Sequence, residues 1–420
     1  MLERPAVHYE ALLGYLETQF RRQGNLGQEY HGLYSRLVEL VYYFLYFRQV
    51  NNNAFLRKRL PFYDGIRALA EANKPLWIFS LNHDVVIEAL AALLSIPLHT
   101  GFSPATITLP CRDHSGKKKG EIRGAILTKN DLEHGAIYFP NPPQPGIYLL
   151  KIHGALDVFT FNNGDDLLKL CPSETSMESI VDVLRAANEE LFYLAQGIPG
   201  GKIRATNEIT YADDQGGMQF LRRSLLAGAY KFDDRATQVL PKSMLKHFRG
   251  NLNFISTLIC IGYSFGDFHI NAALRKWLEF SPERRLEIVS PNSHDVPRFL
   301  LHLSPQIVVT RDSATDYLDS RAGFVRSSRE MLDKRLFSVL RPLGKERVAE
   351  GLASFVKKDR KSLSRAFLAK LRNLALGNGQ GELTAMVDST AVARQWAADM
   401  KLTEEDFLDQ LIRHFESQSK

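Results

Sequence analysis

Five short apolar runs within residues 74–310 limit most strongly what this chain can fold into. Each run is apolar at consecutive positions and rich in β-branched or aromatic residues. The runs are LWIFS (76–80), IYLLKI (147–152), TLICIGYS (257–264), LEIVS (286–290) and IVVT (307–310). Strands that are apolar on both faces are typical of parallel sheets covered by helices. Helical patterns follow at 85–94, 270–278 and 294–301. We therefore expect an α/β fold with a doubly wound, Rossmann-like parallel sheet.

The sequence on either side of this region has a different pattern of apolar residues. Residues 1–75 place apolar side chains at three- and four-residue intervals, which predicts helices. Residues 312–420 carry long, charged amphipathic patterns, with a break at GNGQG (377–381). Residues 101–146 are rich in proline and predict loops. We expect an N-terminal helical segment (1–75), an α/β domain (76–311) and a C-terminal helical domain (312–420).

Composition excludes several classes of protein. The 420 residues include 45% hydrophobic and 24% charged residues, as in an ordinary globular protein, and the net charge is +6. The three cysteines form no C-x-x-C pair, so we expect neither a four-cysteine zinc site nor a disulfide framework. Neither a signal peptide nor an apolar run of about 20 residues is evident. These features predict a soluble, cytoplasmic protein without a membrane partner.

Polar residues follow the first two predicted strands. Asn82 and Asp84 come just after LWIFS, and His153-Gly154 follows IYLLKI. Ligands of open α/β sheets bind where the chain leaves the carboxyl ends of strands, so these side chains could meet there. A histidine in that position could act as a general base, and the glycine permits a tight turn. The alternative is structural, because Asn and Asp commonly cap helices.

The later strands have similar ends. After TLICI the chain reads GYSFGDFHIN, in which Gly262 and Gly266 flank Ser264 ahead of a predicted helix. Backbone N–H groups at such a helix start are a natural contact for phosphate. LEIVS ends at Pro291-Asn292, where the amide of Asn292 could reach a ribose or adenine. A glycine pair after one strand is common, so the information lies in the order and spacing of all four ends.

Taken together over residues 74–310, these four ends resemble the sirtuin superfamily. Ser80-Leu81-Asn82-His83-Asp84 is similar to the family's Thr-Gln-Asn-Ile-Asp segment, Lys151-Ile152-His153-Gly154 to its catalytic His-Gly, and Gly262-Tyr263-Ser264 to its Gly-Thr-Ser. The stretch IGYSFGDFHIN resembles bacterial sirtuin-like proteins of antiphage defence. The resemblance implies an NAD-consuming enzyme that cleaves the nicotinamide–ribose bond, with NAD as substrate and Asn82 and His153 as catalytic residues. The remaining contacts to NAD that it implies are Ser80, Asp84, Gly154, Gly262, Ser264, Gly266, Asp267 and Asn292.

The chain departs from the family pattern in two respects. Ordinary sirtuin deacylases carry a four-cysteine zinc module, so its absence favours NAD hydrolysis over deacylation and implies no metal. The family also opens with a strand and a Gly-Ala-Gly loop, whereas the first glycines here follow no strand-like run. The resemblance therefore implies that the chain begins after that unit. A central strand would then be missing, with unpaired sheet edges and weakened NAD binding as consequences.

Other functions stay open at this point. The chain could be a non-catalytic module that binds NAD or ADP-ribose and contacts a partner protein or a second copy through its terminal helices. A protein deacylase is disfavoured by the cysteine count. A DNA-binding protein would use the lysine run 117–119 and basic C-terminal helices, although such a run is more often a solvated loop.

Overall fold

The computed structural model describes residues 9–22, 26–135, 137–195, 197, 201–225, 243–292, 295–358, 391, 394 and 402–418. The chain divides into two compact units. The main unit comprises Met1–Tyr46 and Phe62–Ala322, and the second unit comprises Phe47–Pro61 and Gly323–Lys420. The N-terminal helical segment is therefore shared between the two units.

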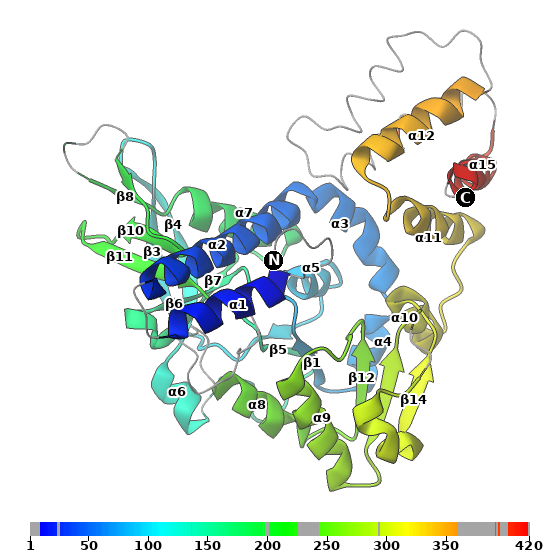
Figure 1. Cartoon of the computed structure of the whole chain (residues 1–420), viewed down its shortest axis with the longest axis horizontal. Coiled ribbons are helices and arrows are strands. Elements are labelled where there is room, and N and C mark those ends of the chain that lie inside the picture. The colour runs from blue at the N-terminus through cyan, green and yellow to red at the C-terminus, as the bar shows by residue number, and fades with distance from the viewer. Residues whose placement is uncertain are drawn as a thin grey trace. The chain divides into compact units, whose positions relative to one another are not determined.

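The helices expected before residue 75 are present in the described part of that segment. They are α1 (Tyr9–Arg21), α2 (Gly27–Asn51), α3 (Asn53–Arg59), η1 (Leu60–Tyr63) and α4 (Ile66–Ala72). Helices α1 and α2 lie side by side (Figure 1), with the Phe20 ring 5.4 Å from the rings of His31 and Tyr34. Tyr42 of α2 is fully buried and donates a hydrogen bond to the carbonyl of Leu156 (3.0 Å), which joins α2 to the turn that follows β5 (Ile147–Lys151).

All five predicted strands are observed, and they form two parallel sheets. One sheet has the order β1 (Leu76–Ser80), β5 (Ile147–Lys151), β2 (Leu98–His99). The other has the order β12 (Thr257–Ile261), β13 (Arg285–Val289), β14 (Ile307–Thr310). We expected one continuous sheet. Among the described residues, β1 and β12 are instead edge strands of separate three-stranded sheets.

The two parallel sheets nevertheless share one apolar core. Leu150 of β5 and Leu286 and Ile288 of β13 belong to the same buried cluster. Helices α5 (Val86–Leu93) and α9 (Phe268–Phe280) follow β1 and β12, as the sequence predicts. The helix expected at 294–301 is a 3-10 helix instead, η3 (Arg298–Gln306), and residues 293–294 lie outside the described residues.

A six-stranded antiparallel sheet was not anticipated. Its order is β10 (Glu208–Ala212), β11 (Met218–Arg223), β6 (Val158–Phe161), β7 (Asp166–Cys171), β4 (Lys118–Leu127), β3 (Thr106–Arg112). The prediction of loops across 101–146 is therefore wrong for β3 and β4. Pro110 does not break β3 because that strand lies at the sheet edge, where a missing N–H donor is tolerated.

The main unit contains further helices and short strands. They are α6 (Lys129–His134), η2 (Asn162–Gly164), α7 (Met177–Glu189), β8 (Tyr193–Leu194), β9 (Lys202–Ile203), α8 (Ser243–Leu252) and α10 (Ala314–Ala322). Helix α8 contributes Met244, Leu245 and Phe248 to the core that the parallel sheets share.

The described C-terminal residues are helical, as expected. The second unit contains α11 (Ser328–Leu340), α12 (Lys345–Lys358) and α15 (Glu404–Gln418). A capping box of Ser327 and Glu330 begins α11. Leu340, Leu352 and Leu411 belong to one buried cluster, so these three helices pack together. The GNGQG segment lies outside the described residues.

Candidate functional site

The loops after β1 and β5 are joined by backbone hydrogen bonds. The N–H of Ile152 donates to the carbonyl of Ser80 (3.0 Å), and the N–H of Leu156 donates to the carbonyl of His83 (2.8 Å). The His83 Nδ1 atom lies 3.4 Å from the carbonyl oxygen of Gly154. The strand ends that carry Asn82 and His153 are therefore neighbours, as their parallel pairing requires.

His153 connects this pair of loops to the second parallel sheet. Its imidazole is 5% exposed, and Nε2 lies 3.3 Å from Oδ2 of Asp267, in the loop between β12 and α9. The other carboxylate oxygen, Oδ1, accepts hydrogen bonds from the N–H groups of His269 and Ile270 and caps α9. The ring of His83 is 6.4 Å from that of His153. Three of the four predicted strand ends thus converge.

The loop that precedes α9 is held in a strained conformation. Phe265 has a φ of +58°, which is uncommon for a bulky residue and is often found at functional sites. Asn271 stabilises this loop, because its amide donates to the carbonyl of Phe265 (2.8 Å) and its oxygen lies 2.8 Å from the Tyr263 hydroxyl. Burial and the nearby Asp267 raise the pKa of Tyr263. Ser264 is exposed on this loop.

Glycine is required at position 154 by the fold itself. Gly154 has a φ of +78°, and a Cβ atom there would lie 1.8 Å from the backbone oxygen of Ser224. Gly262 also has a positive φ, +67°, but a Cβ atom on it would meet open space. Gly266 is exposed, with only the hydroxyl of Ser264 near its Cβ position. The turn at Gly154 thus depends on close backbone packing, whereas Gly262 and Gly266 lie at an open surface.

The four other predicted site residues differ in their exposure to solvent. Ser80 is buried, and its hydroxyl accepts a hydrogen bond from the N–H of Asn82 (3.2 Å). Asp84 uses Oδ1 to accept from the N–H of Val86 at the start of α5 (3.0 Å). The side chains of Asn82 and Asn292 are exposed at the ends of β1 and β13. No contact brings Asn292 to His153 in the part of the chain that the structure describes.

A buried group of four charges beside these loops was missed by the sequence reasoning. The charged cluster comprises Glu88 of α5, Lys151 of β5, Asp157, and Lys169 of β7, each 9% exposed or less. Lys169 pairs with Asp157 and lies 3.4 Å from Glu88, and Lys151 lies 3.5 Å from Glu88. Burial opposes the charge of Lys169, but Asp157 and Glu88 outweigh it and raise its pKa. The available signal was that Glu88, Lys151 and Lys169 each lie inside an apolar stretch of sequence. A charged side chain that is buried there needs a partner.

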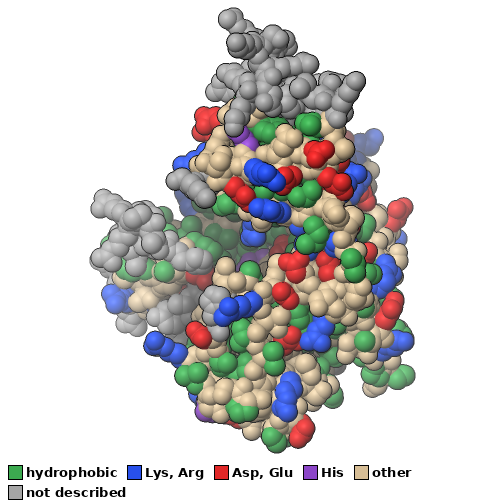
Figure 2. Space-filling view, turned by 90° about the vertical axis from the view of Figure 1, so that its right-hand side faces the viewer, with side chains coloured by type: hydrophobic (Ala, Val, Ile, Leu, Met, Phe, Trp, Pro, Cys, Tyr) green, Lys and Arg blue, Asp and Glu red, His purple; other side chains and the backbone are tan. Residues whose placement is uncertain are grey.

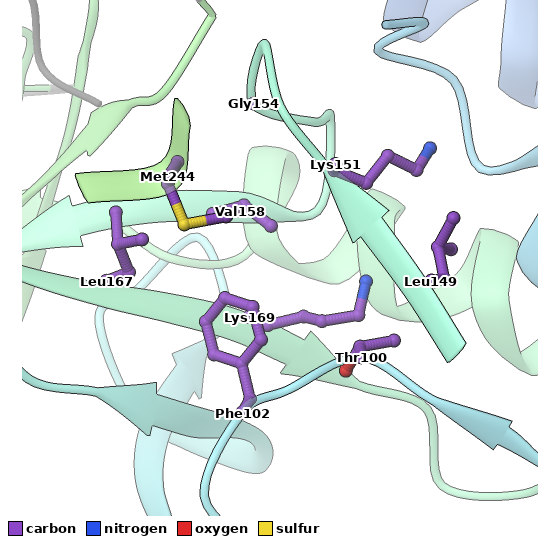
Figure 3. Close-up of a pocket in the computed structure, with 9 residues that line it drawn as sticks. All are labelled: Thr100, Phe102, Leu149, Lys151, Gly154, Val158, Leu167, Lys169 and Met244. Atoms are coloured by element: carbon purple, nitrogen blue, oxygen red, sulfur yellow. The ribbon is translucent and has the colours of Figure 1, made fainter. Parts of the chain in front are cut away.

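A small cavity adjoins the charged cluster. Figure 3 shows Gly154 in the turn beyond β5, Lys151 on that strand and Lys169 on β7, and the other lining residues are apolar except Thr100. The cavity has room for about one water molecule, so it is not itself a dinucleotide site.

Two of the three lysines in the run 117–119 lie beside acidic side chains. Lys118 lies 2.7 Å from Asp214, and Lys119 lies 2.6 Å from Glu190. On the face shown in Figure 2, acidic and basic side chains are interspersed. Neither observation indicates the continuous basic surface that a nucleic-acid partner favours.

The described ranges contain neither a candidate metal-binding group nor a candidate membrane span. No group of three His, Cys, Asp or Glu side chains there could hold a metal ion. No helix in the same part of the chain has the length and apolar character needed to cross a membrane. Neither a protein-family model nor a curated protein sequence matches this chain.

Proposed function

We propose that this chain binds NAD where the ends of β1, β5 and β12 meet, and hydrolyses its nicotinamide–ribose bond. The contact between His153 and Asp267 carries this proposal, because it brings strand ends from both parallel sheets to one place. Ligands of doubly wound folds bind at such a junction, outside the carboxyl ends of strands. We propose that the two parallel sheets belong to a fold of that kind.

In this proposal each residue has a distinct role. Asn82 holds a water molecule whose oxygen bonds to ribose C1′ while the bond to nicotinamide breaks. His153 accepts the proton of that water, and Asp267 fixes the orientation of the imidazole through Nε2. The products are nicotinamide, ADP-ribose and a proton. Ser264 and the N-terminus of α9 would contact the phosphates. A role in antiphage defence rests on the sequence resemblance alone.

The test is NAD turnover by the full chain, with nicotinamide and ADP-ribose separated by chromatography. Loss of a general base typically lowers the rate by about 10²–10⁴-fold, so His153→Ala should lose at least 100-fold. Asn82→Ala should behave similarly. Exposed counterparts serve as controls, namely His302→Ala on η3 and Asn130→Ala on α6. Turnover that survives in both site variants contradicts the catalytic assignment.

Asp267→Asn separates the two functions of that carboxylate. Asparagine caps helices about as well as aspartate, so α9 should keep its stability. The charge opposite His153 is lost, so turnover should fall at least tenfold. If Asp267→Asn cleaves NAD like the wild type, Asp267 has only a capping role.

The burial of His153 favours a second candidate function. With 5% of its surface exposed, the imidazole would be poorly accessible to a substrate. A module that binds NAD or ADP-ribose without cleaving it fits that observation. Saturable binding by calorimetry, without product in the chromatographic assay, would support this candidate over hydrolysis.

A further inference from the structure

The charged cluster is unusual because stability alone does not require it. Removing charges from water is costly, and replacing a buried ion pair by apolar residues of similar volume is often neutral or stabilising. Here two lysines and two carboxylates occupy the interior beside strands that are otherwise apolar. Packing therefore does not explain why these charges are buried, but a role in positioning other residues would.

Lys151 differs from Lys169 in what it touches. The Lys151 ammonium donates a hydrogen bond to the backbone carbonyl of Asp84 and lies 3.5 Å from Oε2 of Glu88. The carbonyl of Asp84 belongs to the loop that carries Asn82. The described contacts of the Lys169 ammonium go only to Glu88 and Asp157.

The position of Lys151 in its strand completes the connection. It is the last residue of β5, two residues before His153, and is paired in register with Ser80 at the end of β1. Lys151 therefore precedes His153 closely in the chain, and its side chain contacts the loop that carries Asn82. Figure 3 shows this strand end beside Gly154.

We propose that Lys151 is a positioning residue: its buried ammonium, anchored by Glu88, fixes the loop 81–85 relative to His153. This inference rests on the proposed function for its catalytic meaning. Its structural part, the ordering of the loop, can be measured without NAD.

The test compares two double variants of the full chain with equal charge changes. Lys151→Met/Glu88→Gln removes the anchor of the loop and leaves Lys169 paired with Asp157. Lys169→Met/Asp157→Asn leaves Lys151 paired with Glu88, and among the described hydrogen bonds and ion pairs it alters none made to loop 81–85. Each variant retains one balanced buried pair.

Backbone hydrogen exchange is the first measurement. Exchange within residues 81–86 should accelerate at least tenfold in Lys151→Met/Glu88→Gln and by less than twofold in the control pair. Lys151→Arg, which keeps a cationic donor for the Asp84 carbonyl, should retain slow exchange. Equal exchange in the two double variants, or fast exchange in a folded Lys151→Arg protein, would overturn the inference.

Steady-state kinetics is the second measurement. Lys151→Met/Glu88→Gln should lower kcat for NAD cleavage at least tenfold with KM changed less than twofold, while the control pair keeps both within twofold. A kcat that falls equally in both pairs means that the cluster acts only through stability, and overturns the positioning role. If the wild type cleaves no NAD, the proposed function fails, and the exchange result still decides whether Lys151 orders the loop.

Discussion

The replacement of Gly154 by alanine gives a quantitative test of the turn that presents His153. Alanine in the left-handed region costs about 1–2 kcal/mol. The new methyl group would lie 1.8 Å from the backbone oxygen of Ser224, so backbone must shift to accommodate it. Overpacking of this kind costs typically about 1–3 kcal/mol. Gly154→Ala should therefore lower the free energy of unfolding of the main unit by about 2–5 kcal/mol.

Gly135→Ala is the matched control. Gly135 has the same φ of +78°, but a Cβ atom there meets nothing within 4 Å. It should lose only the conformational part, about 1–2 kcal/mol. Urea unfolding followed by tryptophan fluorescence measures both variants, since Trp77 and Trp277 lie in the main unit. Equal losses in the two variants would show that Ser224 does not constrain the turn, and would refute the steric reasoning.

Three further predictions concern buried titratable groups. Lys169→Met leaves Asp157 without its ion-pair partner and should destabilise the protein by about 3–5 kcal/mol in urea unfolding, whereas Lys129→Met, at an exposed ion pair, should change little. Burial lowers the pKa of His247 below 6.5, so the unfolded chain binds more protons near that pH. Stability should therefore fall as the pH drops through 6.5, and His247→Gln should show a smaller fall in pH-dependent unfolding. Burial raises the pKa of Cys111 to about 11, so its alkylation by iodoacetamide at pH 8 should be at least about 100-fold slower in the native than in the unfolded protein.

Five of the six described parallel strands could be predicted from sequence because their apolar runs are continuous, whereas the two-residue β2 was not predicted. LWIFS and IVVT match β1 and β14 residue for residue, and the other three runs differ from the observed strands by at most three residues at an end. Strands β3 and β4 of the antiparallel sheet escaped prediction because a proline and a lysine run interrupt their apolar patterns. Pro110 is accommodated at an edge, and Lys118, at the start of β4, lies 3.4 Å from Glu121 and 2.7 Å from Asp214. Both features depend on tertiary contacts, which a short stretch of sequence does not reveal.

The candidate site was predictable in part for a related reason. Strand-end position alone predicted that the loops of Asn82 and His153 would meet, because parallel pairing places their strand ends together. The charged cluster was not predicted, because a lysine inside an apolar run reveals neither its partners nor their location. Glu88 and Asp157 lie 63 and 6 residues from Lys151 in the chain, and only the fold assembles them.

Asp84 and Asp267 show why sequence could not decide between capping and a role in the site. Both aspartates follow a strand and precede a helix, and each has one oxygen, Oδ1, that accepts helix N–H groups. Asp267 is the N-cap of α9, whereas the N-cap of α5 is Val85 and Asp84 accepts only the N–H of Val86. What distinguishes Asp267 is its second oxygen, which lies 3.3 Å from Nε2 of His153, in the turn that follows a strand of the other parallel sheet. One carboxylate can cap a helix with one oxygen and contact an imidazole with the other. Evidence for capping therefore does not argue against a functional role.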